Sequence, residues 1–189
     1  DICLDGRKIL ILEDNKHTLE VLKQMAQSFG MTVTGLTTGA EAVALIEAAA
    51  ADKEPYELCV VDLELSDKEP FEIMSGIKAL NIFHPFILAI SNSVTDVASL
   101  CRNAGVNGFL PKPTNRQTFH NMLKTLASNR RENRKTDFIT QYSIKENLKH
   151  SVSVFSICHD NEQAEHWKIM LDNSGYVNFV TTDAMSAVQ

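Results

Sequence analysis

Three acidic residues in the first third of the chain have the types and spacing of a metal site. Glu13 and Asp14 follow the apolar run KILIL, and Asp62 follows the apolar run LCVV. Carboxylates that gather in one small cleft repel one another and raise one another's pKa unless a cation lies among them. Mg²⁺ suits such a cleft, because it prefers one or two carboxylates together with phosphate and water. The three carboxylates therefore predict a Mg²⁺ site.

A hydroxyl and a lysine extend this set toward phosphoryl chemistry. Ser91 follows the apolar run FILAI, and Lys112 lies between two prolines. A hydroxyl donates to a phosphoryl oxygen, and a lysine offers a positive point charge to a carboxylate or a phosphate. Aspartate is a nucleophile that forms aspartyl phosphates. Each residue alone has an ordinary explanation, as a helix cap or as surface, but together they predict phosphoryl transfer to Asp62.

Five strand–helix repeats are expected to position these residues. The predicted strands are Lys8–Glu13, Thr32–Leu36, Leu58–Val61, Phe86–Ile90 and Gly108–Leu110, and the predicted helices are 16–29, 40–51, 71–80, 94–103 and 114–127. Strands that are apolar throughout are covered on both faces, so the fold class is α/β with a doubly wound parallel sheet. We expect the flavodoxin-like strand order 2-1-3-4-5, which gathers the polar residues at the carboxyl ends of the strands.

Composition and charge exclude several classes of protein. The 189 residues include 18 Lys and Arg and 24 Asp and Glu, which give a formal net charge of −6. This balance argues against a nucleic-acid binder that works through positive charge. Apolar runs stay well below the ~20 residues of a membrane span, so we expect a cytoplasmic segment without membrane contact. Four scattered cysteines without a CxxC pair favour a reducing compartment over a disulfide framework.

A nucleotide- or flavin-binding enzyme is the structural rival for such a sheet. It requires a glycine-rich or hydroxyl-lined turn after the first strand, where the backbone approaches phosphate. That turn is Glu13-Asp14-Asn15-Lys16, which is acidic and has no glycine. We therefore set this class aside.

On these residues the chain resembles the receiver domain of two-component response regulators. Glu13-Asp14, Asp62, Ser91 and Lys112-Pro113 have the family's spacing within residues 6–127. The resemblance implies that Asp62 is the phosphoacceptor and that Ser91 and Lys112 contact the phosphoryl group. It also implies the Mg²⁺ ligands, which are Glu13, Asp14, Asp62 and the backbone carbonyl of Glu64.

The same resemblance implies a conformational switch and two positions that tune dephosphorylation. Phe109 corresponds to the aromatic switch residue, and phosphorylation would pull Ser91 inward and let Phe109 become buried. Glu64 and Ser93 occupy positions that tune dephosphorylation in the family. Lys112–Pro113 is expected to be a cis peptide. The alternative is a degenerate receiver that acts as a structural or dimerisation module without phosphotransfer.

The wider resemblance is to the tandem receiver region of a hybrid sensor histidine kinase. It is carried by the lead-in Leu4–Lys8, by Phe109–Pro113 and by the restart of the pattern near residue 151. It implies a histidine kinase or histidine phosphotransfer domain as partner, and a homodimer through the fourth helix, fifth strand and fifth helix. A receiver catalyses its own phosphorylation and dephosphorylation, and the kinase catalytic motifs lie outside this sequence.

The end of the chain looks like a partial second copy. Residues 128–150 are expected to be a polar linker, and VSVFSIC (152–158) is again a predicted strand. We align His159-Asp160-Asn161 with Glu13-Asp14-Asn15, so that His159 replaces the first acid and one residue is lost in the next helix. Residues 151–189 are then the first part of a second receiver-like domain. The chain begins without Met and ends in an unfinished helix pattern, so we expect a piece of a longer protein.

Overall fold

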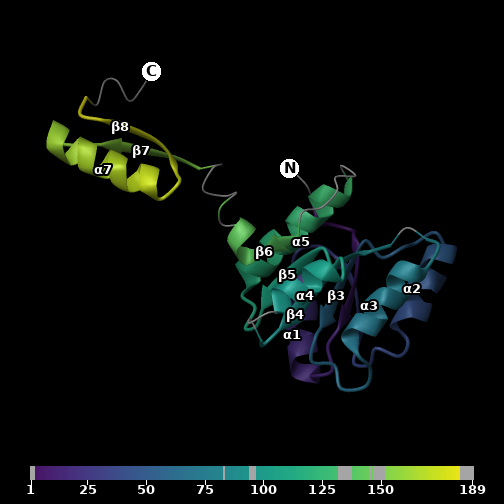
Figure 1. Cartoon of the computed structure of the whole chain (residues 1–189). Helices are drawn as coiled ribbons and strands as arrows, with labels where there is room; N and C mark the ends of the chain where they lie inside the picture. Colours follow the sequence, from purple (N-terminus) through teal and green to yellow (C-terminus); the bar gives the residue numbers. More distant parts are fainter. Residues whose placement is uncertain are drawn as a thin grey trace. The chain divides into compact units, whose positions relative to one another are not determined.

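Six parallel strands form the sheet of the first of two units in the computed structural model (Figure 1). The strands are β1 (Lys8–Leu12), β2 (Thr32–Leu36), β3 (Leu58–Asp62), β4 (Phe86–Ser91), β5 (Gly108–Pro111) and β6 (Ile139–Thr140). Their order is β2-β1-β3-β4-β5-β6, which confirms the flavodoxin-like order predicted for the first five. The structure describes residues 3–82, 84–93, 97–131, 138–144, 146 and 152–183.

Five helices connect and follow these strands. They are α1 (Lys16–Gln27), α2 (Ala42–Ala51), α3 (Pro70–Ala79), α4 (Val97–Asn103) and α5 (Arg116–Arg131). Asn15 caps α1, because its side chain accepts hydrogen bonds from His17 N and Thr18 N. Residues 94–96, with which we expected the fourth helix to begin, lie outside the described residues.

The helices cover both faces of the sheet, as the continuously apolar strands predict. One cluster of buried side chains joins Leu10 and Leu12 of β1 to residues of α2, α3 and α4. On α1 and α5, the buried residues include Leu22 and Phe119, and these two helices contact each other. The burial of both faces fixes the strands, and therefore fixes the loops at their carboxyl ends.

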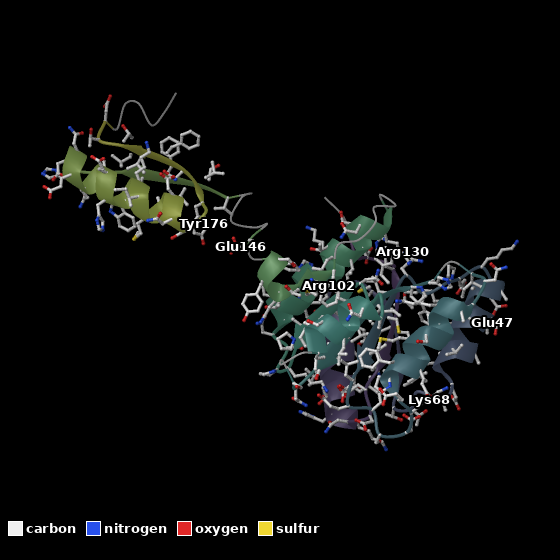
Figure 2. All side chains as sticks on the ribbon, in the orientation of Figure 1. Glu47, Lys68, Arg102, Arg130, Glu146 and Tyr176 are labelled. Atoms are coloured by element: carbon white, nitrogen blue, oxygen red, sulfur yellow. The ribbon has the colours of Figure 1, made fainter. Side chains whose placement is uncertain are left out.

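The segment expected as a linker includes two parts of the first unit. Helix α5 continues to Arg131, and β6 pairs with β5 in the register Gly108↔Ile139 and Phe109↔Thr140. A Cβ on Gly108 would lie 3.2 Å from the carbonyl oxygen of Ile139, so glycine allows this close pairing. Arg130, labelled in Figure 2, donates to the carbonyl of His84 and places its guanidinium over the ring of Phe86.

The second unit, from Tyr142 onward, contains β7 (Ser153–Ile157), α7 (Asn161–Asn173) and β8 (Val177–Thr181). Its two strands are parallel, like β1 and β2. The rings of Phe155 and Phe179 stack across them with centroids 5.4 Å apart. The unit therefore repeats the opening β-α-β arrangement of the first unit.

The helix caps correct the predicted alignment of the two copies. Asn15 caps α1 and Asp160 caps α7, and Gly30 and Gly175 end these helices with positive φ. Both pairs are 145 residues apart, so no residue is lost in the helix. The positions of Glu13 and Asp14 are consequently taken by Cys158 and His159. The prediction that Asp160 preserves an acid of the site is wrong, because its carboxylate accepts from Gln163 N as a helix cap.

Candidate functional site

Three carboxylates converge where β1 and β3 end. Glu13 and Asp14 follow β1, and Asp62 is the last residue of β3. One oxygen from each lies within 4.8 Å of the others. Glu13 and Asp62 are each 1% exposed. The adjacent parallel strands bring these residues together, as the sequence predicts, and three hard oxygen donors at this spacing fit the ligand preference of Mg²⁺.

Lys112 reaches into the same cluster from the end of β5. Its Nζ lies 2.9 Å from Glu13 Oε2 and 2.9 Å from Asp62 Oδ1. Its backbone N–H donates to the carbonyl of Ser91 at 2.8 Å, and the predicted cis peptide to Pro113 is confirmed. One ammonium therefore bridges the two most buried carboxylates.

The buried cluster changes the pKa of its members. Loss of hydration on burial is the largest cause that raises the pKa of Asp62, the hydrogen bond from Lys112 opposes it, and the charge of Glu13 adds to the rise, so that the pKa is about 6. Burial lowers the pKa of Lys112, but its contacts with Glu13 and Asp62 outweigh burial and hold that pKa above the ordinary value. A single ammonium thus leaves the Asp62 carboxylate under-compensated, which is the condition that a bound cation relieves.

The side chain of Glu64 accepts several donors around the end of β4. Its Oε1 accepts from Ser91 Oγ at 2.7 Å and from Asn92 N at 2.8 Å. Its Oε2 accepts from Asn92 Nδ2 at 2.9 Å and lies 3.5 Å from Lys112 Nζ. Burial acts to raise the pKa of Glu64, but these donors prevail and the pKa is lowered. The carboxylate of Glu64 is therefore held as an anion.

The loop after β3 is tied to its neighbours by two aspartates. Asp14 Oδ2 accepts from Ser66 N at 3.2 Å. Asp67 accepts from Gly39 N at 2.8 Å and from Ala40 N at 3.2 Å, which joins this loop to the loop before α2. A Cβ on Gly39 would meet the Cδ1 atom of Ile73, so a larger residue there would require the Ile73 side chain to move. Sequence reasoning missed Asp67, because its partners lie 28 and 27 residues away.

The two residues expected to move or to tune the site have distinct positions. Phe109 is 3% exposed, so its ring is already buried, whereas we expected burial to follow phosphorylation. The backbone N–H of Ser93 donates to Ser91 Oγ at 3.0 Å, and Ser93 is otherwise exposed. The structure therefore combines an engaged Ser91 with a buried Phe109.

Comparison with known proteins decides the family. The family model of the response regulator receiver domain matches residues 9–124. The chain belongs to the response regulator receiver family. Its receiver is 27% identical over 127 residues to hybrid signal transduction histidine kinase L of Dictyostelium discoideum, covering 65% of this chain and 7% of that protein. It is 24% identical over 112 residues to ethylene receptor 2 of rice, covering 58% of this chain and 14% of that protein.

Solved receivers have the same fold. The receiver domain of a sensor histidine kinase from Pseudomonas aeruginosa, solved with a magnesium ion coordinated in its active site cleft, is 26% identical, with a TM-score of 0.58 over 65% of this chain and 98% of that one. A CheY-like receiver from Methanospirillum hungatei is 22% identical, with a TM-score of 0.59 over 68% of this chain and 99% of that one.

In the described part of the chain, every helix is too short or too polar to span a membrane.

Proposed function

We propose that the receiver, at residues 6–127, accepts a phosphoryl group on Asp62 in a two-component phosphorelay. The observation that carries this proposal is the contact of Lys112 Nζ with Asp62 Oδ1 at 2.9 Å, beside two further carboxylates. A nucleophilic carboxylate needs a cationic partner that also reaches the incoming phosphate, and a lysine is suited to both. Glu13, Asp14, Asp62 and the carbonyl of Glu64 would hold Mg²⁺.

The transfer requires no oxidant and no further reactant. An oxygen of Asp62 attacks phosphorus, the new P–O bond forms as the P–N bond of a phosphohistidine breaks, and the imidazole nitrogen leaves with the electron pair and is then protonated. Lys112 and the hydroxyl of Ser91 contact the oxygens of the transferred group. Mg²⁺ held by Glu13, Asp14 and Asp62 would supply positive charge to offset the charge that develops on those oxygens. Dephosphorylation is a separate reaction, in which water attacks phosphorus, the P–O bond to Asp62 breaks, and the Asp62 carboxylate and inorganic phosphate are released.

The partner that this chemistry requires is a histidine kinase or a histidine phosphotransfer domain. The similarity to hybrid histidine kinase L supports a place for this receiver in a hybrid kinase. On that proposal the segment works in the cytoplasm and needs no nucleic acid. A homodimer through α4, β5 and α5 is a further proposal.

A degenerate role without phosphotransfer is the second candidate, and one observation favours it for the second unit. Cys158 and His159 occupy the positions that Glu13 and Asp14 hold in the receiver, and Cys158 is 6% exposed. A buried thiol beside an imidazole lacks the paired oxygen donors that Mg²⁺ prefers. We propose that residues 151–189 are the first part of a receiver-like domain without this metal site, after a segment at 128–150.

The test is incubation of the full chain with acetyl phosphate or beryllofluoride and Mg²⁺. We expect an Asp62-dependent adduct, seen as a mass increase with acetyl phosphate and as shifts of the Ser91 and Phe109 resonances with beryllofluoride. Asp62→Asn should show neither change. An adduct that persists in Asp62→Asn, or no response from the unmodified chain, would sink the proposal.

A further inference from the structure

The donors that the proposed phosphoryl group needs are already engaged by a side chain of the same loop. Ser91 Oγ, Asn92 N and Asn92 Nδ2 all donate to the carboxylate of Glu64, and Lys112 Nζ lies 3.5 Å from it. We propose that Glu64 is an internal ligand whose carboxylate must leave these donors before a phosphoryl group can bind to them. This inference rests on the proposed function of Asp62.

The carboxylate of Glu64 is placed as a bound anion would be, and not as a side-chain ligand of the metal. Its backbone N–H donates to Asp62 Oδ1 at 3.2 Å, so the backbone of Glu64 lies beside the phosphoacceptor. Its side chain then turns toward the end of β4, where Ser91 Oγ accepts from Ser93 N and keeps its own proton free to donate. A carboxylate with three short donors and a nearby ammonium is bound as a phosphate oxygen would be.

The same side chain is able to leave. Glu64 is 38% exposed, whereas Asp62 is 1% exposed. An exposed carboxylate exchanges its protein donors for water without opening the core, so departure requires only rotation of the side chain. The donors become available to a phosphoryl group in the fraction of molecules in which Glu64 has turned outward.

The buried ring of Phe109 is consistent with the Glu64 carboxylate occupying the place of a phosphoryl oxygen at Ser91. We expected Ser91 to move inward and Phe109 to become buried only when a phosphoryl group draws on the hydroxyl. In the structure, the Ser91 hydroxyl donates to Glu64 and the Phe109 ring is buried at the same time. The contact with Glu64 therefore accompanies the buried Phe109 that the family resemblance ascribes to the phosphorylated form. Glu64 competes with the phosphoryl group for the donors of Ser91 and Asn92.

A simpler explanation is that Glu64 only repels phosphate through its charge. The two explanations differ for Glu64→Asp, which keeps the charge and shortens the side chain by one methylene. An internal ligand that must reach Ser91 and Asn92 together loses those contacts in Glu64→Asp. Charge repulsion survives in Glu64→Asp and disappears in Glu64→Gln.

The experiment is a beryllofluoride titration of the full chain in saturating Mg²⁺, followed by NMR. Glu64→Ala, Glu64→Asp and Glu64→Gln are compared with Glu69→Ala, which removes an exposed carboxylate of the same loop that forms no cap hydrogen bond. We expect Glu64→Ala and Glu64→Asp to bind beryllofluoride about tenfold more tightly, the factor for donors that are free in about a tenth of the molecules. The Asn92 amide resonance should shift in the Glu64 variants before any beryllofluoride is added, and stay in place in Glu69→Ala.

The outcomes separate the two proposals. Equal affinities of the unmodified chain and Glu64→Ala, or unchanged affinity in Glu64→Asp with a gain in Glu64→Gln, would overturn the internal ligand and leave the phosphoacceptor role intact. Absence of Asp62-dependent binding in every variant would overturn both. Asp62-dependent binding by the unmodified chain that becomes tighter in Glu64→Ala and Glu64→Asp would support both.

Discussion

Lys112 Nζ lies 2.9 Å from Asp62 Oδ1, and the same ammonium lies 2.9 Å from Glu13 Oε2. One positive charge therefore serves two carboxylates that are almost fully buried. Burial of an unpaired charge is strongly unfavourable, so the stability of the folded receiver depends on what compensates this pair. The receiver consequently couples its folding free energy to the ligands of the site.

Lys112→Met is expected to destabilise the receiver most when metal is absent. The variant leaves Glu13 and Asp62 without a cation, and removal of one partner from a buried ion pair costs about 3–5 kcal/mol. Urea unfolding in EDTA measures this loss, and Mg²⁺ should restore a large part of it. Lys53→Met, at an exposed position after α2 and outside the cluster, serves as the control. A loss that Mg²⁺ leaves unchanged would contradict the expectation.

Asp62→Asn is expected to stabilise the metal-free receiver above pH 6. Because the pKa of Asp62 is raised to about 6 in the folded chain, the folded form binds more protons than the unfolded form between about pH 4 and 6. The stability contributed by this group therefore falls as pH rises through that window. The variant should gain about 1–3 kcal/mol at pH 7.5 in EDTA and little at pH 4. Urea unfolding at both pH values measures the difference, and an equal gain at both would contradict the account.

Asp67→Ala is expected to loosen the loop before α2 and the loop after β3. Its carboxylate is the acceptor for Gly39 N and Ala40 N, and loss of hydrogen bonds to a charged acceptor costs about 1.5–3 kcal/mol. Amide hydrogen exchange at these two positions should become faster, while exchange in α5 stays unchanged. Asp67→Asn keeps one acceptor oxygen and should lose about half as much. Unchanged exchange at Gly39 in Asp67→Ala would show that Asp67 does not join the two loops.

Much of the site could be predicted from the residue types at the strand ends. The rest depends on loop conformations and side-chain rotamers, which sequence patterns do not reveal. Asp62 and Lys112 were predicted to meet, because parallel strands end at one edge of a sheet. The contact between Glu64 and Ser91 joins side chains 27 residues apart and depends on one rotamer in a loop. Strand β6 has only two residues, too few for periodicity to reveal.

The second copy shows a different limit. Alignment by chemical likeness paired Asp160 with an acid of the site, but the same residue type also caps helices, and the cap is what Asp160 forms. Helix starts and the glycines that end helices were the better guides to register. The residue type alone does not distinguish a helix cap from a metal ligand, because both roles use a carboxylate.

The full chain is expected to bind one Mg²⁺ in the receiver and none in the second unit. Among the described residues, only Glu13, Asp14 and Asp62 form a cluster of three such ligands, whereas the equivalents of the first two are Cys158 and His159. Isothermal titration calorimetry should give a stoichiometry of one, and Asp14→Asn should abolish that binding. The paired change Cys158→Ala and His159→Ala should leave it intact. A second equivalent of Mg²⁺ that disappears with Cys158→Ala and His159→Ala would show that the second unit holds metal and would contradict the prediction.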